Sequence, residues 1–527
     1  MRYNFQSYKI KKKTQIYTTS PFLVSLSPLL LFSPSPVLPF TLSPLPPLSP
    51  SPFLPLTHSP SRSNLIFPYL YSLKPKPMKY SRRSFVKTAG MASAALASFP
   101  DMSLLSGLPL QVEVMNPFNK VPISFIIDDS TCLVNMAHFG IPQFAETFPD
   151  QYKQDWRKLP REIPDSFVRE FGEWCHENGV KGKYSIVPYP ACTGWVSRFI
   201  PGWTKKELEN SLALVRELMV PDWDIHPEMV SHTRVIDIKT GKPFSSPSPE
   251  YMENWDWSQT KSADELAAYQ AYALTILKEA GLPCEGLTTP GGYGGRNQNN
   301  LALGTKEAVR DVFKAEIPHY FRDLFTEKGV SVAPRVLHPS GLEGPDPECV
   351  VSIIGCTGDW FGGWDGLEPG NVDNFITPDL QSGRMIDVIE SGEPAVMVCH
   401  WPGIYYNGEK VGFNILKEVK KRLDQKYDHL IWMKLSEIAR YWAARELTTI
   451  TAQKEKVTFK APYSCPAFTI KLNTSVRKPQ IKSGTGETIP LLRVKNVKEL
   501  SSNTFYSDRA GSVLCFNLEK GSGELIL

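Results

Sequence analysis

Two adjacent carboxylates and two separated histidines are the residues of this sequence best suited to chemistry. Asp128 and Asp129 directly follow the apolar run 123–127, and His232 and His400 each follow a later run of similar character. Carboxylate oxygens and imidazole nitrogens bind divalent ions such as Zn²⁺. The same groups can take up and release protons at the reacting atoms. These residue types indicate a site for metal-assisted or acid–base chemistry.

A repeating pattern of elements carries these residues. From Val121 to about Tyr441, short β-rich apolar runs alternate with amphipathic helical stretches. This predicts a parallel sheet with helices outside, either a barrel or a doubly wound sheet. Strands are expected at Ile123–Ile127, Tyr184–Val187, Trp223–His226, Gly286–Thr289, Val350–Ile354, Ala395–Cys399 and Leu430–Met433. Helices are expected at Pro164–Asn178, Thr204–Met219, Ala263–Ala280, Lys306–Lys314, Arg384–Glu390 and Phe413–Gln425.

The order of the residues after the strands is informative. Reading only the carboxyl ends of the strands gives Asp128-Asp129, then His232, then a Gly-rich loop from Pro290, then Asp359-Trp360, and last His400-Trp401. In a parallel barrel every such end opens on the same rim. We therefore expect these side chains to share one pocket, with His400 facing Asp128.

This order resembles the five motifs of the polysaccharide deacetylase family, which has NodB homology, over roughly residues 120–445. Ile127–Ser130 is similar to the first motif, Glu228–Thr233 to the start of the second, and Thr289–Tyr293 to the third. Gly358–Phe361 is similar to the fourth, and Val398–His400 to the fifth. The resemblance implies an α/β fold of the deacetylase type, a (β/α)7 barrel.

The family resemblance also implies roles. Asp128 would be the general base and His400 the general acid. Asp129 and His232 would be ligands of a divalent metal ion, with zinc the expected metal. The reaction implied is the removal of acetyl groups from an amino sugar or an acetylated polysaccharide.

The sequence departs from the family pattern at two places. The second motif normally has another histidine four residues after the first, and Ile236 stands there. His226 is expected as the replacement ligand, with Asp237 as the other candidate. The third motif normally begins with an arginine that orients the base, and Thr288 stands there.

Aromatic residues on the expected rim suit a carbohydrate substrate. Five of them are expected to stack on sugar faces: Tyr293, Trp360, Trp364, Trp401 and Tyr405. Two alternatives remain open. A non-catalytic carbohydrate-binding relative would explain the missing arginine and histidine, and a glycosidase would use paired carboxylates such as Asp128 and Asp359.

The first hundred residues look like targeting sequence. Residues 1–77 are rich in Pro and Ser, which blocks helices and strands, and are expected to lie upstream of the true start at Met78. Residues 78–97 have the layout of a signal peptide, and Ser81–Lys87 resembles the twin-arginine consensus. The resemblance implies bacterial export through the twin-arginine machinery to the periplasm or the medium. The apolar stretch of the signal is too short to span a bilayer, so no transmembrane segment is expected.

Charge excludes one class of partner. The first hundred residues hold 12 Lys and Arg and no Asp or Glu, so the remaining chain has 46 basic against 54 acidic residues. An acidic folded part argues against nucleic acid as a partner. The expected organisation is a deacetylase-like barrel over residues 98–447 and a small antiparallel β domain over residues 455–527.

Overall fold

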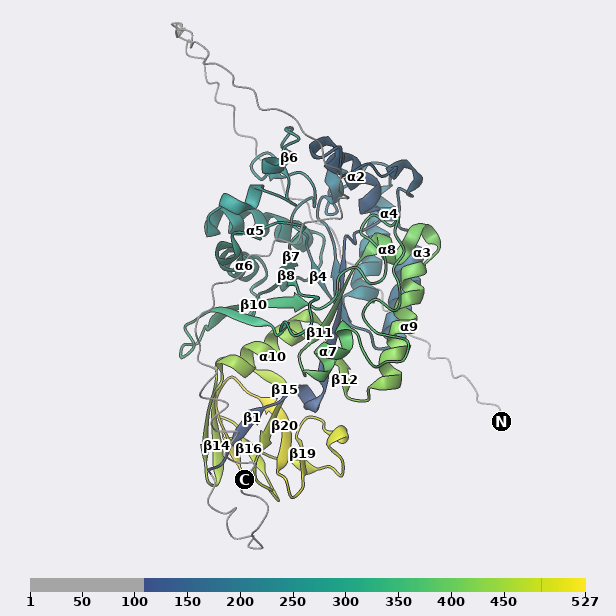
Figure 1. Ribbon diagram of the computed structural model, residues 1–527. Helices are drawn as coiled ribbons and strands as arrows, with labels where there is room; N and C mark the ends of the chain where they lie inside the picture. Colours follow the sequence, from purple (N-terminus) through teal and green to yellow (C-terminus); the bar gives the residue numbers. More distant parts are fainter. Residues whose placement is uncertain (1–108, 485) are drawn as a thin grey trace, which may run out of the picture. The chain divides into compact units, whose positions relative to one another are not determined.

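The computed structural model describes residues 109–484 and 486–527 (Figure 1). The expected Pro/Ser-rich segment 1–77 and the signal peptide 78–97 lie outside the described residues. Within the described ranges, no helix combines the length and the apolar character that crossing a bilayer requires.

A parallel sheet carries the first half of the candidate site. Its strand order is β11 (Ala395–His400), β2 (Val121–Asp128), β3 (Gly182–Ser185) and β4 (Trp223–His226), and β12 (Leu430–Trp432) pairs with the start of β2. Every residue of β2 is buried. A parallel strand covered on both faces requires such an uninterrupted apolar run, which is why the sequence located β2 and β11 well.

A second sheet lies beside the first. Its order is β7 (Gly286–Thr288), β8 (His319–Leu324), β10 (Glu348–Gly355) and β9 (Arg335–Ser340), with β7, β8 and β10 parallel and β9 antiparallel at the edge. The sequence did not predict β8 and β9, because polar residues such as Arg322 and Asp323 interrupt their apolar character.

The mixed α/β class with parallel strands is confirmed, but the predicted closed (β/α)7 barrel is not. Among the described residues the two sheets are joined only by single parallel bridges, Glu228 with Thr288 and Asp359 with Val398. Pro227 follows β4 directly, and Pro290 stands two residues after β7. Proline has no N–H to extend a ladder, so the pairing between these short strands stops at one bridge.

Helices cover the sheets (Figure 1). They are α2 (Met136–Thr147), α3 (Asp165–Glu177), α4 (Lys205–Leu214), α5 (Ala263–Glu279), α6 (Gln298–Phe313), α7 (Arg384–Glu390), α8 (Trp401–Tyr405), α9 (Val411–Lys426) and α10 (Leu435–Leu447). Capping boxes at Thr204 and Ser262 start α4 and α5 where the sequence predicts them. Helix α2 was not expected, because Pro142 lies inside it.

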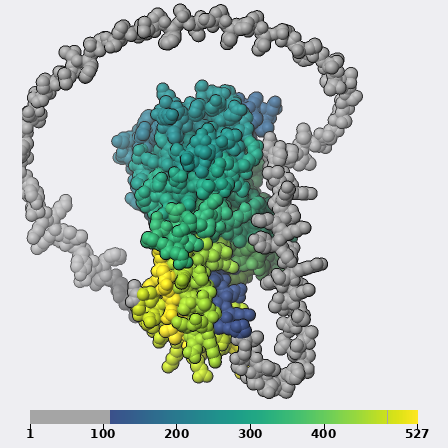
Figure 2. All heavy atoms as spheres, turned by 90° about the vertical axis from the view of Figure 1, so that its left-hand side faces the viewer, coloured from purple at the N-terminus to yellow at the C-terminus, as the bar shows by residue number. Residues whose placement is uncertain are grey.

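The C-terminal region is mainly antiparallel β structure. One five-stranded sheet contains β13 (Thr449–Gln453), β14 (Lys456–Ala461), β21 (Gly521–Ile526), β16 (Gln480–Lys482) and β17 (Thr488–Pro490). The other contains β1 (Val112–Val114), β15 (Cys465–Leu472), β20 (Ser512–Leu518), β19 (Thr504–Ser507) and β18 (Leu492–Arg493). In this sheet β18 and β19 form a parallel pair. Figure 2 shows the first described residues, in dark blue, beside these yellow-green strands, as the pairing of β1 with β15 requires.

Helix α10 joins the two regions. The hydroxyl group of Tyr441 on α10 donates to the carbonyl of Met115 at 2.7 Å and accepts from the backbone N–H of Thr469 at 3.2 Å. Apolar side chains of α10, the parallel strands and the β sheets form one hydrophobic cluster. The C-terminal region therefore supports the α/β part from the side of α10, away from the carboxyl ends of β2 and β11 (Figure 1).

Candidate metal centre and acid–base pairs

The end of β2 directs two neighbouring carboxylates to different partners. Asp128 is the last residue of β2, and Asp129 follows in the left-handed conformation with φ 60°. This change of backbone conformation separates their contacts. Asp128 pairs with Lys183, whereas Asp129 pairs with His232.

Asp129, Glu228 and His232 form a buried group, which we call the rim cluster. His232 Nε2 lies 2.7 Å from Asp129 Oδ1 and 3.3 Å from Glu228 Oε2. The backbone N–H of Asp129 donates to both oxygens of Glu228 at 3.1 and 3.2 Å. The three side chains therefore present one imidazole nitrogen and two carboxylate oxygens to a common point.

The rim cluster fits a divalent cation. Asp129 Oδ1 is buried and faces His232 Nε2 at 2.7 Å. Burial opposes the charged form of His232, but the Asp129 carboxylate outweighs it and raises the pKa of His232 to about 9. The negative charge of Asp129 and Glu228 that stabilises the imidazolium would also stabilise a bound cation, which would replace the proton on His232 Nε2. Two carboxylates and one histidine are ligands that zinc accepts.

Glu228 was not assigned a role from the sequence. The family pattern places a second histidine four residues after His232, but that position is Ile236, which is buried in the core. The third ligand is instead Glu228, which stands four residues before His232, so the spacing of four runs toward the N-terminus. The carboxylate of Glu253 holds the backbone N–H of His232 at 2.6 Å. This contact fixes the loop so that His232 returns toward Glu228.

The replacement ligands suggested by the sequence do not reach the rim cluster. His226 lies on β4 below the rim, where its Nε2 is 3.0 Å from His319 Nε2. Asp237 lies on the short strand β5 (Ile236–Asp237), and its carboxylate accepts from the backbone N–H of Lys239 at 2.9 Å. His226 points inward because residues two apart on a strand share a face, so it lies on the same side as Asp224.

His226, His319 and Asp224 form a second group of possible ligands, which we call the inner cluster. Burial lowers the pKa of His226 well below its usual value and lowers the pKa of His319 to about 4. Asp224 accepts from the backbone N–H and the hydroxyl of Ser436, at 2.6 and 2.8 Å, at the start of α10. Neutral imidazoles can bind a metal ion, but the Asp224 carboxylate of this group is already held by Ser436 at the start of α10.

Lys183 is the second residue that the sequence did not single out. Its side chain is completely buried, and its ammonium pairs with Asp128 Oδ1. The ammonium also donates to Ser185 Oγ at 2.6 Å and to Glu228 Oε1 at 3.3 Å. Burial raises the pKa of Asp128 to about 6, against the opposing effect of Lys183. Lys183 thus takes the orienting contact to Asp128 that the resemblance assigns to an arginine at position 288.

His400 lies beside Asp128 on the neighbouring strand. The two residues are partners in the parallel register of β11 with β2. His400 Nδ1 lies 2.5 Å from Asp359 Oδ1, and both side chains are half-buried. Loss of solvation opposes the charged imidazolium, but the Asp359 carboxylate outweighs it and raises the pKa of His400 well above its usual value. His400 is therefore poised to carry a proton.

Three of the five aromatic residues expected to bind sugar, Tyr293, Trp360 and Trp401, are completely buried, whereas Trp364 and Tyr405 are half-buried. Trp401 packs on Phe167 with ring centroids 5.0 Å apart. Trp360 donates its indole N–H to the carbonyl of Val372 at 3.2 Å, and Tyr293 packs near Trp257. These large rings fill the core under the rim, so none of the three presents a face to a ligand.

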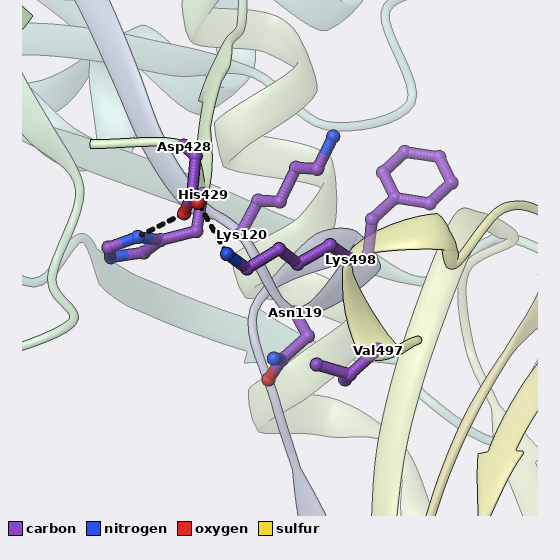
Figure 3. A pocket seen from close by; sticks show the side chains of 7 residues that line it. Asn119, Lys120, Asp428, His429, Val497 and Lys498 are labelled. Carbon is purple, nitrogen blue, oxygen red and sulfur yellow. Dashed lines mark hydrogen bonds and ion pairs between the residues drawn. The ribbon is translucent and has the colours of Figure 1, made fainter. Parts of the chain in front are cut away.

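The hollow in Figure 3 is separate from these groups. It is lined by Lys120, Asp428, His429 and Lys498 among others, and its volume is about 170 Å³. Lys120 precedes β2, whereas Asp128 ends it, so the hollow lies at the opposite end of the strand. Lys498 closes part of it by pairing with Asp428.

Comparison with known proteins does not assign the chain to a family. No family model matches the sequence, and no protein of curated function matches it. Among solved structures, a probable polysaccharide deacetylase from Pseudomonas aeruginosa PAO1 is similar with a TM-score of 0.29 and 12% identity, over 61% of this chain and 90% of that one. A protein from Parabacteroides distasonis, described provisionally as a glycoside hydrolase/deacetylase, has a TM-score of 0.35 and 10% identity, over 68% and 82%. At these values the geometry of the site has to carry the functional argument.

Proposed function

We propose that this chain is a metal-dependent hydrolase that removes acetyl groups from an amino sugar or an acetylated polysaccharide. One observation carries the proposal. The rim cluster lies next to a buried carboxylate paired with a lysine, Asp128, and to a histidine paired with a carboxylate, His400. A cation site between a base and an acid is the arrangement that amide hydrolysis needs.

The residues divide the chemistry between them. When bound to Asp129, Glu228 and His232, a divalent cation supplies Lewis-acid polarisation of the amide carbonyl oxygen. Asp128, with its pKa raised to about 6, accepts a proton from the attacking water. His400, which Asp359 keeps protonated, donates a proton to the leaving nitrogen. Lys183 holds Asp128 in position throughout.

The test is acetate release from a soluble N-acetylated oligosaccharide such as chitotetraose. We expect release by the purified chain, its loss after removal of metal with a chelator, and its recovery when Zn²⁺ is restored. Asp128→Asn should lower the rate by about 10²–10⁴-fold. Release that is unaffected by both the chelator and Asp128→Asn would contradict the proposal.

Lys183 supports a second candidate, a carbohydrate-binding protein without catalysis. Its buried ammonium already lies near Asp128 and Glu228, so part of the negative charge is balanced without a metal ion. This candidate predicts glycan binding with neither bound metal nor acetate release. The same assay therefore separates the two functions.

We also propose that the protein acts outside the cytoplasm after twin-arginine export. The support is the sequence Ser81–Lys87 with its paired arginines. Changing Arg82 and Arg83 to lysine together should leave the protein in the cytoplasm of a twin-arginine-competent host. Export that survives this double change would remove the support.

A further inference from the structure

Four aromatic side chains gather beside His232 of the rim cluster. Phe144 is buried, and its ring centroid lies 6.4 Å from that of His232. Tyr152, Trp255 and Trp364 surround Phe144, with ring centroids 5.2, 5.5 and 5.8 Å away. We call these four residues the aromatic wall.

The aromatic wall is built by segments that follow three different strands. Phe144 and Tyr152 lie on and just after α2, which follows β2. Trp255 lies in the segment between β4 and α5, and Trp364 lies in the segment between β10 and α7. All three strands end at the side that carries Asp128 and His400. Loops at the carboxyl ends of parallel strands are where α/β proteins bind ligands.

The outer rings of the wall keep part of their surface free. Tyr152, Trp255 and Trp364 are only half-buried, unlike Tyr293, Trp360 and Trp401, which are completely buried. Tyr152 stands between the two indoles, with centroids 6.0 Å from Trp255 and 5.9 Å from Trp364. The contacts are edge-on, which leaves ring faces for another flat partner.

Polar groups without partners accompany these rings. Asn254, next to Trp255, and Gln154, two residues after Tyr152, each have a buried side-chain oxygen that bonds to no described residue. Buried polar atoms usually have a partner, so an unpaired one suggests that a water or ligand supplies it. Aromatic faces with a few amide groups are a suitable lining for a sugar, which has apolar C–H faces and hydroxyl edges.

We infer that the aromatic wall is a subsite for pyranose rings that flank the sugar at the rim cluster, so that the ligand is an oligosaccharide and not a single sugar. The inference rests on the proposed function for the identity of the central sugar. Trp255 and Trp364 stack on the sugar faces, and Asn254 and Gln154 bond to hydroxyl groups. Two indoles on either side of a phenol provide contacts for more than one sugar residue.

The experiment is calorimetric binding of chitotetraose and of N-acetylglucosamine to the Asp128→Asn chain, in which the substrate is not consumed. Trp255→Ala and Trp364→Ala should each weaken tetramer binding by about tenfold or more, whereas the weak binding of the monomer stays the same. Trp174→Ala is the matched control, because Trp174 is a half-buried indole on α3 that packs on Phe413. It should leave tetramer binding unchanged.

A conservative variant distinguishes the loss of a stacking ring from poor folding. Trp364→Phe keeps a ring at this position, so it should retain much of the affinity that Trp364→Ala loses. Tetramer affinities within twofold of the parent in both alanine variants would overturn the inference, and so would a parent that binds no tetramer. Acetate release by the chain that retains Asp128, together with unchanged tetramer binding in the tryptophan variants, would leave the proposed function standing and overturn the subsite. Tetramer binding that depends on the tryptophans, without acetate release, would support the subsite and overturn the proposed function.

Discussion

The rim cluster and the inner cluster contain the same kinds of ligand atoms, and both are buried. In the rim cluster, a single histidine faces two carboxylates, with His232 Nε2 2.7 Å from Asp129 and 3.3 Å from Glu228. In the inner cluster, two histidines face each other and the single carboxylate is held by Ser436. The pKa of His232 is raised in the first, and the pKa of His319 is lowered in the second.

The difference shows that proximity of histidine and carboxylate is not sufficient to define a metal site. What separates the two clusters is the balance of charge and hydrogen bonds. Excess carboxylate favours a cation at the rim, whereas desolvation favours neutral imidazoles inside. The predictions below use this difference.

The largest effect is expected at Lys183, which connects the rim cluster to Asp128. Lys183→Met removes the partner of two buried carboxylates, Asp128 and Glu228. Breaking a buried ion pair on one side costs about 3–5 kcal/mol of unfolding free energy. We also expect acetate release to fall by about 10²-fold, because the base is no longer held. Denaturant unfolding and the acetate assay measure both effects.

Lys181→Met is the control for that change. Lys181 lies two residues earlier and makes only a partly exposed ion pair with Asp222 at 4.0 Å. Such pairs contribute about 0–1 kcal/mol, so stability and activity should hardly change. Equal effects of the two substitutions would show that Lys183 has no special role at the site.

A smaller effect is expected from the inner cluster. His319→Ala leaves His226 Nε2 without its neighbour and should lower the unfolding free energy by about 1–3 kcal/mol. It should leave the bound metal in place, because the rim cluster is intact. His429→Ala, at a histidine whose side chain is 45% exposed, is the control and should change neither the stability nor the bound metal. Loss of metal in His319→Ala would mean that the ion belongs to the inner cluster.

The inner cluster also predicts how stability depends on pH. The folded pKa of His319 is about 4, below its usual value of 6.5, so the unfolded chain binds more protons between these pH values. Stability should therefore fall as the pH falls from about 6.5 toward 4. The fall should be less steep in His319→Ala. An unchanged slope in urea unfolding series would contradict this assignment.

The smallest effect is expected at the acid. Asp359 raises the pKa of His400, so Asp359→Asn should let His400 lose its proton at a lower pH. The alkaline limb of the profile of kcat/KM against pH should shift to lower pH by about one unit or more. Asp373→Asn, which affects a carboxylate paired with Arg422, should leave the limb in place. An alkaline limb that stays in place in Asp359→Asn would remove His400 from the role of acid.

Parts of this account could be predicted from the sequence, for physical reasons. Continuous apolar runs located β2 and β11, and reading their carboxyl ends led to Asp128 and His400. The sequence does not predict helix α2, because a proline such as Pro142 usually ends a helix. The prediction of a closed barrel is not confirmed, because the sequence pattern contains no information on how many bridges join β4 to β7.

Lys183 and Glu228 show where sequence reasoning stops. Lys183 lies 55 residues from Asp128, and a lysine in a strand usually points to solvent. Only the pairing of β3 with β2 inside the sheet reveals that the Lys183 side chain is buried. Glu228 could have been found from its spacing of four to His232, but this required a carboxylate to be considered in place of a histidine.

Metal analysis of the purified full chain, with Asp129→Ala and His226→Ala beside it, tests the central claim most directly. The rim cluster predicts about one divalent ion per chain, which is retained in His226→Ala and largely lost in Asp129→Ala. Elemental analysis after dialysis against metal-free buffer gives the result. A chain that retains no ion, or one that loses its ion in His226→Ala but keeps it in Asp129→Ala, would contradict the account.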